Sequence, residues 1–511
     1  MQECNRIISG KNQKVRRSIE IILIIFRKDD LMESLYQKLM EYSNSDYYPF
    51  HMPGHKRQAC FNNMTKMSEM FSLDITEIEG FDNLHQPEGI LRQAQERVST
   101  LYGSEESFLL VNGSTCGILA AISAIAELGK KVIVARNCHK AVYNAIHLNR
   151  LEAVYIWPDY LEEYDIQGSI RVSQIEKALE ENADIAGIIL TSPTYDGIVS
   201  DVRDICKAAH KYQVPVIVDE AHGAHFSFHE DFPESAVTQG ADIVINSTHK
   251  TLPALTQTAL LHVQGKRIDR TRLKDYLAIY QTSSPSYLLM ASIDAAMEWV
   301  EKEGVEGFEP LFTYRRKFEE GCKELKHIKI MPWEKGINDP GKLIISVKNA
   351  RISGMQLYQM LWKDYQIQME MAAPGYVLGI LTPMDKEEGI DRLVKALGDV
   401  DGKIESNSSE ETGGQENEIK VKIPLYHDLA RPHCRMLLWE AYSKPKKWEC
   451  LESATGKICG KVVNLYPPGI PILVPGEEIE QVHINQIKEA LAKEMKVQGL
   501  TEDKKICTIC M

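Results

Sequence analysis

The chain has 511 residues and 11 cysteines, with 44% hydrophobic and 26% charged residues. This composition predicts a folded chain with room for several domains. The net charge of −13 argues against nucleic acid or an anionic membrane as a partner. The scattered cysteines predict reduced thiols in a cytoplasmic protein, and the one close pair, Cys507 and Cys510, is too small a ligand set for a metal site.

The amino-terminal stretch has a basic flank and an apolar run at residues 19–26, interrupted by Glu20. That run is far shorter than the roughly 20 residues that a membrane helix needs, and it lacks the small-residue cleavage site of a secretory signal. We therefore expect residues 1–31 to be an extension outside the fold and residues 32–94 to form an N-terminal segment.

The middle of the chain alternates between apolar runs rich in β-branched residues and helical patterns. The helical patterns lie at 118–128, 173–182 and 202–213. Such alternation predicts an α/β fold with a mostly parallel, doubly wound sheet, here of seven strands within residues 95–299. The seven apolar runs are 107–111, 131–136, 153–157, 185–191, 214–221, 242–247 and 258–263.

Three further parts are expected after the sheet. Residues 300–400 have the mixed pattern of a smaller α/β domain. Residues 401–418 are polar, acidic and glycine-rich, which indicates a solvated linker. Residues 419–511 contain a proline-rich turn and an amphipathic helix, and are expected to form a C-terminal α+β domain.

Polar residues follow the predicted strands at their carboxyl ends, where ligands of such sheets bind. Asp219 closes the apolar strand VPVIVD, and Lys250 lies one strand further on. An acid that ends a strand often only caps the next helix, and most lysines are solvated. Pyridoxal phosphate chemistry, however, needs both a buried carboxylate for the ring nitrogen and a lysine amine for an imine.

Three further features favour this interpretation. The turn NGST at 112–115 offers N–H groups and hydroxyls to a phosphate at a helix terminus, although such a turn alone is weak support. His139 follows the next strand, where an imidazole can stack on a ring or be an ordinary structural residue. Ser247 and His249 add two donors beside Lys250.

Seven motifs occur in one order along the chain: FHMPGHK (50–56), the run DITEIEG to LAAI (74–122), SPTYDGIVSD (192–201), DEAHGAH (219–225), STHKTLPALTQTALL (247–261), QTSSPSYLLMAS (281–292) and YPPGIPILVPGE (466–477). Together they resemble the short form of the ornithine/lysine/arginine decarboxylase family. The resemblance covers residues 45–300 and extends into the C-terminal domain. It implies the aspartate-aminotransferase-like fold of pyridoxal-phosphate enzymes.

Carried over by position, the resemblance implies roles for individual residues. Lys250 forms the imine with the cofactor, Asp219 pairs with the pyridine nitrogen and His139 stacks on the ring. His222, which replaces a tryptophan of long-form members, lies near the ring hydroxyl, and either Lys250 or His222 acts as the general acid. The remaining implied contacts are Ser114, Thr115, Ser247 and His249 to the phosphate, Ala221 under the ring, and Ser283 and Ser284 to the phosphate of a neighbouring subunit.

The activity implied by the resemblance is decarboxylation of a basic amino acid to an amine in cytoplasmic polyamine metabolism. The implied assembly is a homodimer or larger homo-oligomer with active sites at the subunit interface. Two alternatives are another enzyme of this fold, such as an aminotransferase, and a non-catalytic homologue that serves as a scaffold. A dehydrogenase ranks last because no G-x-G-x-x-G opens a helix after the first strand.

The basic substrate requires an acidic partner in the protein, because an unpaired buried cation costs several kcal/mol. Glu477 is one candidate, and Glu79, Asp82 and Glu88 in a single loop are the others. Each of these acids is equally typical of a solvated turn. Arginine, lysine and ornithine remain equal candidates for the substrate.

Overall fold

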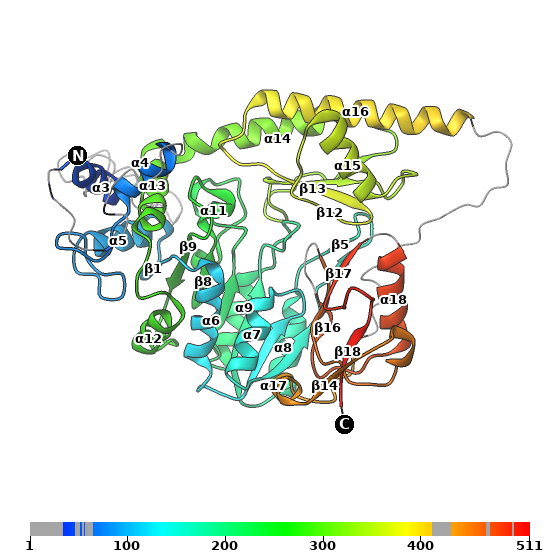
Figure 1. Ribbon diagram of the computed structural model, residues 1–511, viewed down its shortest axis with the longest axis horizontal. Helices are drawn as coiled ribbons and strands as arrows, with labels where there is room; N and C mark the ends of the chain where they lie inside the picture. Colours follow the sequence, from blue (N-terminus) through cyan, green and yellow to red (C-terminus); the bar gives the residue numbers. More distant parts are fainter. Residues whose placement is uncertain are drawn as a thin grey trace, which may run out of the picture.

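The computed structural model describes residues 34–45, 47, 52–53, 56, 65–410, 431–466, 471–492 and 495–510. In the view of Figure 1 a sheet domain occupies the centre, a smaller domain lies above it, and a C-terminal domain lies at its side. The predicted extension at 1–31 falls outside the described residues. Within the described parts, no helix is long and apolar enough to cross a membrane.

The central sheet has seven strands in the order β1-β9-β8-β7-β6-β2-β3. Neighbouring pairs from β8 to β3 are parallel, and β9 runs antiparallel to both of its neighbours. The predicted fold class, with a mostly parallel seven-stranded sheet, is therefore confirmed. The strands are β1 (Glu106–Leu110), β2 (Lys131–Ala135), β3 (Glu152–Ile156), β6 (Ile185–Thr191), β7 (Val216–Asp219), β8 (Ile243–Asn246) and β9 (Ala259–Val263).

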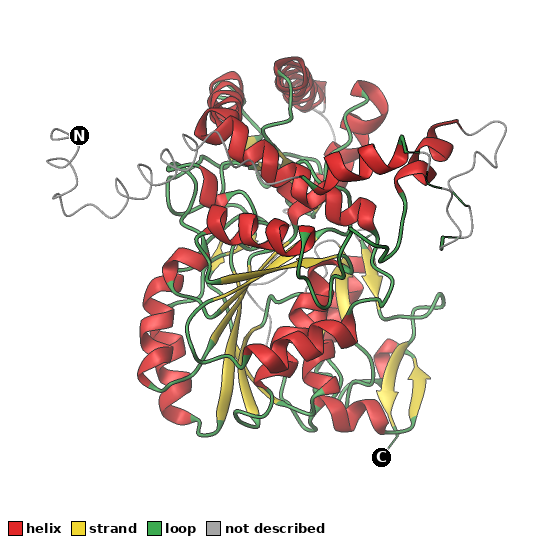
Figure 2. Ribbon diagram, turned by 90° about the vertical axis from the view of Figure 1, so that its left-hand side faces the viewer, coloured by secondary structure: helices red, strands yellow, loops and turns green. Residues whose placement is uncertain are grey.

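Both faces of this sheet are buried. In β2, Val132 and Val134 belong to one core cluster and Ile133 to another. Because successive strand side chains point to opposite faces, continuous apolar runs require helices on both sides, and Figure 2 shows the sheet flanked in this way. Helices α6 (Gly113–Ile125), α7 (Lys140–Leu148) and α12 (Arg270–Tyr280) pack into the first cluster, and α8 (Val172–Glu181), α9 (Val202–Lys211) and α10 (Ala236–Gln239) into the second.

A third core cluster joins the N-terminal segment to the sheet and small domains. Its polar anchor is Asp294, which forms a buried ion pair with Arg97 and accepts a 2.8 Å hydrogen bond from Leu35 N. The predicted domain boundary at 299–300 falls inside α13. The helices of this region are α3 (Leu35–Ser43), α4 (Thr65–Leu73), α5 (Ile90–Tyr102) and α13 (Tyr287–Glu303), with the 3-10 turns η1 (Phe226–Phe228) and η2 (Gly304–Phe308).

The small domain is a four-stranded antiparallel sheet, β10-β11-β13-β12, covered by helices. Its last helix extends through residues 401–410, so that part of the predicted linker at 401–418 is helical. The elements are α14 (Glu309–Gly321), β10 (Lys329–Ile330), β11 (Lys342–Ser346), α15 (Gly354–Tyr365), β12 (Met371–Ala372), β13 (Tyr376–Ile380) and α16 (Glu387–Glu410).

The C-terminal part combines a two-stranded sheet, β14-β18, and a three-stranded sheet, β16-β15-β17, with two helices. This matches the expected α+β composition. Its elements are α17 (Leu438–Ser443), β14 (Lys446–Glu449), η3 (Leu451–Ser453), β15 (Val463–Tyr466), β16 (Pro471–Leu473), α18 (Gln481–Ala492), β17 (Lys496–Gln498) and β18 (Ile506–Ile509).

Candidate active site

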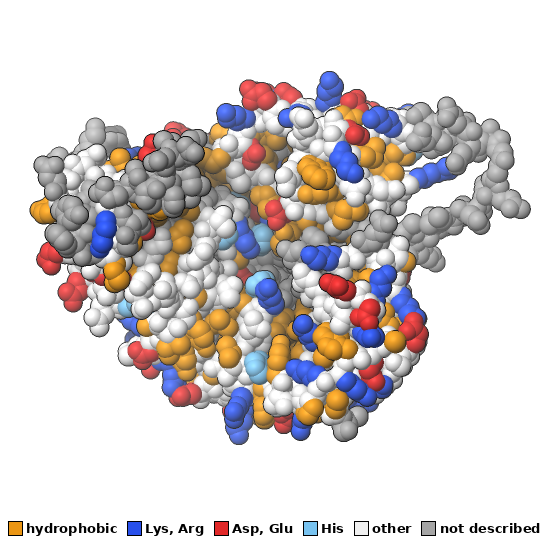
Figure 3. Space-filling view, viewed as in Figure 1, with side chains coloured by type: hydrophobic (Ala, Val, Ile, Leu, Met, Phe, Trp, Pro, Cys, Tyr) orange, Lys and Arg blue, Asp and Glu red, His pale blue; other side chains and the backbone are white. Residues whose placement is uncertain are grey.

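Predicted site residues meet at the carboxyl edge of the parallel strands. Ser114 lies in the first turn of α6, His139 immediately precedes α7, Asp219 ends β7, and Ser247 follows β8. Strands that run in one direction bring their carboxyl ends to one edge, which explains how residues far apart in sequence come together. Figure 3 shows histidine and basic side chains gathered in the hollow between the sheet domain and the small domain.

Two of the predicted phosphate-binding residues touch directly. The Ser247 and Ser114 hydroxyls lie 3.0 Å apart and share a hydrogen bond, which joins the turn after β8 to the start of α6. Gly113 adopts φ +73°, a left-handed conformation that glycine tolerates best. Thr115 is exposed beside it. Hydroxyls and the amino end of a helix are therefore grouped where an anion can be bound.

His249, a predicted phosphate ligand, already uses one ring nitrogen in a hydrogen bond within the protein. Its Nδ1 donates to the Thr258 carbonyl over 2.8 Å, so the neutral ring presents only an Nε2 lone pair. Burial lowers the pKa of His249, which disfavours the protonated ring. Nε2 can therefore donate a hydrogen bond to a phosphate only when the negative charge of the bound anion raises the pKa of His249 and keeps Nε2 protonated.

Asp219 is a buried carboxylate with few partners. It is 4% exposed, and among the described residues its hydrogen bond comes from Ala221 N at 3.1 Å. Burial raises the pKa of Asp219, while His139 and Lys250 oppose that shift. The next helical turn, η1, begins only at residue 226, so Asp219 caps no helix.

Lys250 lies in the short helix α11 (Thr248–Thr251), close enough to this carboxylate for their charges to interact. It is half-buried, and burial lowers its pKa, although Asp219 and Glu370 act in the opposite direction. A lysine with a lowered pKa has more of the free amine, which is the nucleophilic form.

His139 presents an exposed imidazole beside this pair. Its Nδ1 accepts a 3.2 Å hydrogen bond from Ala141 N, so the ring caps the amino end of α7. This contact fixes the ring while leaving it accessible. Stacking on a flat cofactor is compatible with that position.

His222 lies between Lys250, which was predicted to belong to the site, and Lys342, which was not. Its Nε2 is 3.0 Å from Lys250 Nζ, and its Nδ1 is 2.8 Å from Lys342 Nζ. Burial, followed by Lys342 and Lys250, lowers the pKa of His222 well below its ordinary value. The imidazole is therefore neutral, which limits it as a general acid unless it receives a proton from a neighbour.

Lys342 was missed because it opens a strand of the small domain, far from the predicted sheet edge. The segment after β6 reaches it: Ile198 bridges to Asn338, and Asp339 N donates to the Gly197 carbonyl over 2.9 Å. Gly197 has φ +98°, and a Cβ there would lie 2.6 Å from Lys342 Cγ. The motif DPGK ahead of an apolar run was the available sequence signal.

The small domain also contributes an acidic group. Glu370, next to β12, accepts a hydrogen bond from the Tyr195 hydroxyl, and its negative charge partly opposes the lowering of the pKa values of Lys250 and Lys342. It is exposed, so its carboxylate is accessible from solvent. Tyr195 in turn packs edge-on against the His222 ring, with 4.8 Å between ring centroids.

The predicted substrate acids lie in different settings. Glu477 is 2% exposed, and both of its oxygens contact Arg136 Nη2, at 3.0 and 3.1 Å. It therefore joins the C-terminal domain to β2, and its charge is already paired. Asp82 accepts backbone hydrogen bonds from Glu88, Gly89 and Leu91, which organise its loop.

Ser283 and Ser284 are exposed in the segment between α12 and α13. This segment is held beside the start of α6, because Thr282 N donates to Asn112 Oδ1 over 3.4 Å. The contact of these serines with a neighbouring subunit stays a prediction.

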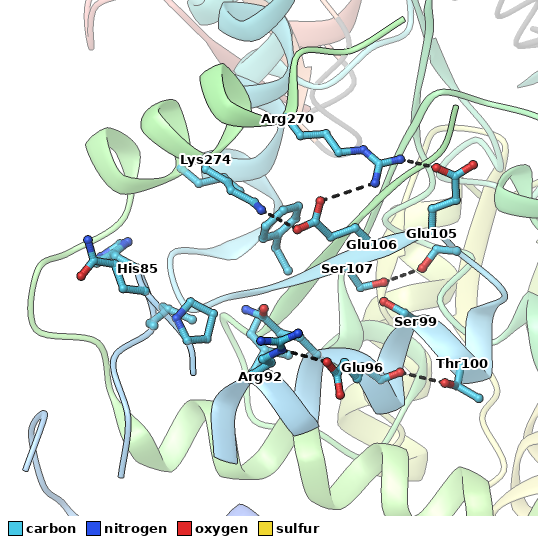
Figure 4. Close-up of a pocket in the computed structure, with 18 of the residues that line it drawn as sticks. His85, Arg92, Glu96, Ser99, Thr100, Glu105, Glu106, Ser107, Arg270 and Lys274 are labelled. Atoms are coloured by element: carbon cyan, nitrogen blue, oxygen red, sulfur yellow. Dashed lines mark hydrogen bonds and ion pairs between the residues drawn. The ribbon is translucent and has the colours of Figure 1, made fainter. Parts of the chain in front are cut away.

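A cavity of about 1000 Å³ lies elsewhere, between α5, β1 and α12. In Figure 4 its basic side chains face acids: Arg270 contacts Glu105 and Glu106, and Lys274 lies 2.7 Å from Glu106. None of the predicted catalytic or cofactor residues lines it. Its paired charges leave little net attraction for an ionic ligand.

Comparisons with known families match most of the chain. The family model described as Orn/Lys/Arg decarboxylase, major domain, matches residues 33–385, and the corresponding C-terminal domain model matches residues 435–503.

Individual proteins extend the likeness to most of the chain. An uncharacterized protein of Bacillus subtilis, YaaO, is 35% identical, and the arginine decarboxylase of the same organism is 32% identical; each alignment covers 91% of this chain and 95% of the relative. The Francisella novicida lysine decarboxylase structure superposes with a TM-score of 0.76 at 19% identity, covering 94% of this chain and 82% of that chain. This last likeness concerns the fold alone.

Proposed function

The chain belongs to the Orn/Lys/Arg decarboxylase family, and on that premise we propose that it uses pyridoxal 5'-phosphate to decarboxylate arginine. Decarboxylation of a basic amino acid is the activity that the family match supports. The observation that carries the proposal is the half-buried Lys250 beside the buried Asp219, within one cluster with His139 and His222.

The residues present fit the cofactor. Asp219 is a buried carboxylate whose described partners leave room for one more donor, and a protonated ring nitrogen supplies one. Ser114 and Ser247 would bind the phosphate together with the amino end of α6. Thr115, Ala221, His249, Ser283 and Ser284 complete the proposed cofactor contacts.

When bound, pyridoxal phosphate supplies an aldehyde that condenses with amines and a ring system that accepts the electron pair left by the departing carboxylate. Lys250 would supply the amine that binds the aldehyde. Asp219, ionised, would keep a proton on the ring nitrogen, because a nearby negative charge favours the protonated base. Lys250, when protonated, would return a proton to the substrate α-carbon after decarboxylation.

Arginine is the proposed substrate because the arginine decarboxylase of B. subtilis aligns over nearly its whole length. Glu370 is the proposed partner of the substrate's cationic end. It is an accessible acid that acts electrostatically on both site lysines, whereas Glu477 is already paired. A carboxylate can accept two hydrogen bonds from a guanidinium group at once, which favours arginine over an ammonium.

The test is a substrate panel with the purified protein and pyridoxal phosphate. Arginine, lysine, ornithine, aspartate and glutamate are supplied separately, and carbon dioxide, amine and keto acid are measured. We expect carbon dioxide and agmatine from arginine, and a raised KM for arginine in Glu370→Gln. Keto acid without carbon dioxide would instead assign an aminotransferase, and no product from any amino acid would favour a non-catalytic scaffold.

A further inference from the structure

The His222 imidazole is hydrogen-bonded to a lysine on each side. Lys250 approaches Nε2 from the sheet domain, and Lys342 approaches Nδ1 from β11 of the small domain. Lys342 is only 3% exposed, and its Nζ also lies 5.7 Å from the centre of the Tyr195 ring. The proposed reaction assigns no role to Lys342, although this lysine is buried and hydrogen-bonded to His222.

The number of available protons restricts this arrangement. A neutral imidazole has one N–H donor and one lone pair, whereas a lysine ammonium can only donate. Two ammonium groups therefore cannot both bond to His222. With one of the two lysines charged, two arrangements satisfy both contacts: an ammonium at Lys342 with a free amine at Lys250, or the reverse.

The buried acids around Lys342 favour the first arrangement. Asp339 is 2% exposed and accepts hydrogen bonds from His225 Nε2 and Gly341 N. Its Oδ2 has no hydrogen-bond partner among the described residues, and Asp339 is the largest electrostatic influence stabilising the charge of Lys342. Burial lowers the pKa of Lys342 to about 8, so it is mostly charged at pH 7.

We propose that Lys342 is a positioning residue that keeps Lys250 as a free amine. Its ammonium donates to His222 Nδ1, which places the imidazole proton on Nε2. That N–H then points at the lone pair of Lys250 Nζ. The catalytic consequence rests on the proposed function, because the free amine is the form that would bind the cofactor's aldehyde.

Other charged groups face the two lysines, and all of them are unchanged in the Lys342 and His222 variants that test the proposal. Those acting on Lys342 are Asp339, Asp196 and Glu370, and those near Lys250 are Asp219, His139, His249 and Glu370. Within the described residues, none of these other groups is hydrogen-bonded to His222, whereas Lys342 contacts its Nδ1, so the proposed coupling through the imidazole is specific to Lys342.

The experiment measures the reactivity of Lys250 in the full chain without cofactor. Acetic anhydride labels free amines, and mass spectrometry of peptides gives the labelled fraction of Lys250 against pH, with exposed Lys140 as internal reference. Wild type is compared with Lys342→Met, which removes the charge, and Lys342→Arg, which retains a cationic donor. Thermal melting shows whether each variant is folded.

We expect Lys342→Met to raise the labelling midpoint of Lys250 by about one pH unit or more, which is a tenfold loss of free amine at neutral pH. Lys342→Arg should restore the midpoint toward wild type. An unchanged midpoint in Lys342→Met would overturn the proposal.

A second comparison separates the imidazole contact from direct charge repulsion. In a His222→Phe background, Lys342→Met should change the Lys250 midpoint much less than in wild type. An equal change in both backgrounds would overturn the relay through His222. Because labelling requires neither cofactor nor turnover, a protein inactive on every amino acid but showing the predicted midpoints would refute the proposed function and leave this inference standing.

Discussion

At the residue scale, the surroundings of Lys250 make it chemically different from a surface lysine. Burial lowers its pKa, and its Nζ is held 3.0 Å from His222. The place of Lys250 after a strand and the motif around it predict a site residue. Its neighbours support that assignment, while its role as cofactor-binding amine stays a prediction.

Lys250→Ala should leave the chain folded and abolish turnover, because no other amine occupies its position. With wild type, borohydride treatment after pyridoxal phosphate is added should remove the visible absorbance band and attach the cofactor to the Lys250 peptide, as read by mass spectrometry. Lys140→Ala, at an exposed position, serves as the matched control and should label like wild type. A colourless wild-type protein that never takes up cofactor would contradict the prediction.

Asp219→Asn removes a negative charge while retaining the shape of the side chain. The cofactor should still bind, but turnover should fall by roughly 10²–10³ or more, as when electrostatic groups are deleted from other enzymes. Cofactor absorbance and kcat are measured on the same preparation. Activity within about twofold of wild type would assign Asp219 a purely structural role.

At the scale of elements, Arg136 fastens the end of β2 to the C-terminal domain. Besides Glu477, its Nη1 donates to the Tyr143 hydroxyl over 2.8 Å, and its guanidinium lies 5.0 Å from the centre of the Tyr155 ring. Burial disfavours its charge, yet Glu477 and these tyrosines raise the pKa of Arg136 above its ordinary value. The cluster joins the C-terminal domain to the end of β2 through buried, paired charges.

Glu477→Ala should destabilise the protein by about 3–5 kcal/mol, because it leaves a buried arginine unpaired. Chemical denaturation compares it with Glu478→Ala, the adjacent residue, whose pair with Arg435 is more exposed. That control should lose only about 0–1 kcal/mol. Equal denaturation midpoints for the two variants would mean that the buried pair adds no stability.

The elements themselves were largely predictable. All seven apolar runs overlap strands of the central sheet. A strand that is buried on both faces needs apolar residues at every position, and this produces continuous apolar runs in the sequence. Residues 401–410 were expected as linker from their composition, yet α16 continues through them. Polar, acidic residues also suit the solvated end of a helix, so composition alone did not mark where the helix ends.

At the scale of the whole molecule, we propose a cytoplasmic homodimer or larger assembly that supplies amines to polyamine metabolism. Support for assembly comes from Ser283 and Ser284, which are exposed beside the start of α6, where a neighbouring subunit could approach. Light scattering after gel filtration should give at least twice the mass of one chain.

Ser284→Arg should weaken that assembly and cofactor binding together, because a bulky charged side chain would stand at the proposed interface. Ser453→Arg, an exposed serine of the C-terminal domain, is the matched control and should leave both unchanged. A monomeric wild-type protein with full cofactor occupancy would contradict the shared site.

The sequence by itself determined the sheet, its strand-end residues and the family, since strand periodicity and motifs are local along the chain. Only the tertiary structure decided which groups surround Lys250 and what Glu477 contacts. Lys342 and His222 are 120 residues apart, and Arg136 and Glu477 are 341 apart. Such pairs form when separate domains pack, and a buried lysine or glutamate has no local pattern that distinguishes it from a solvated one.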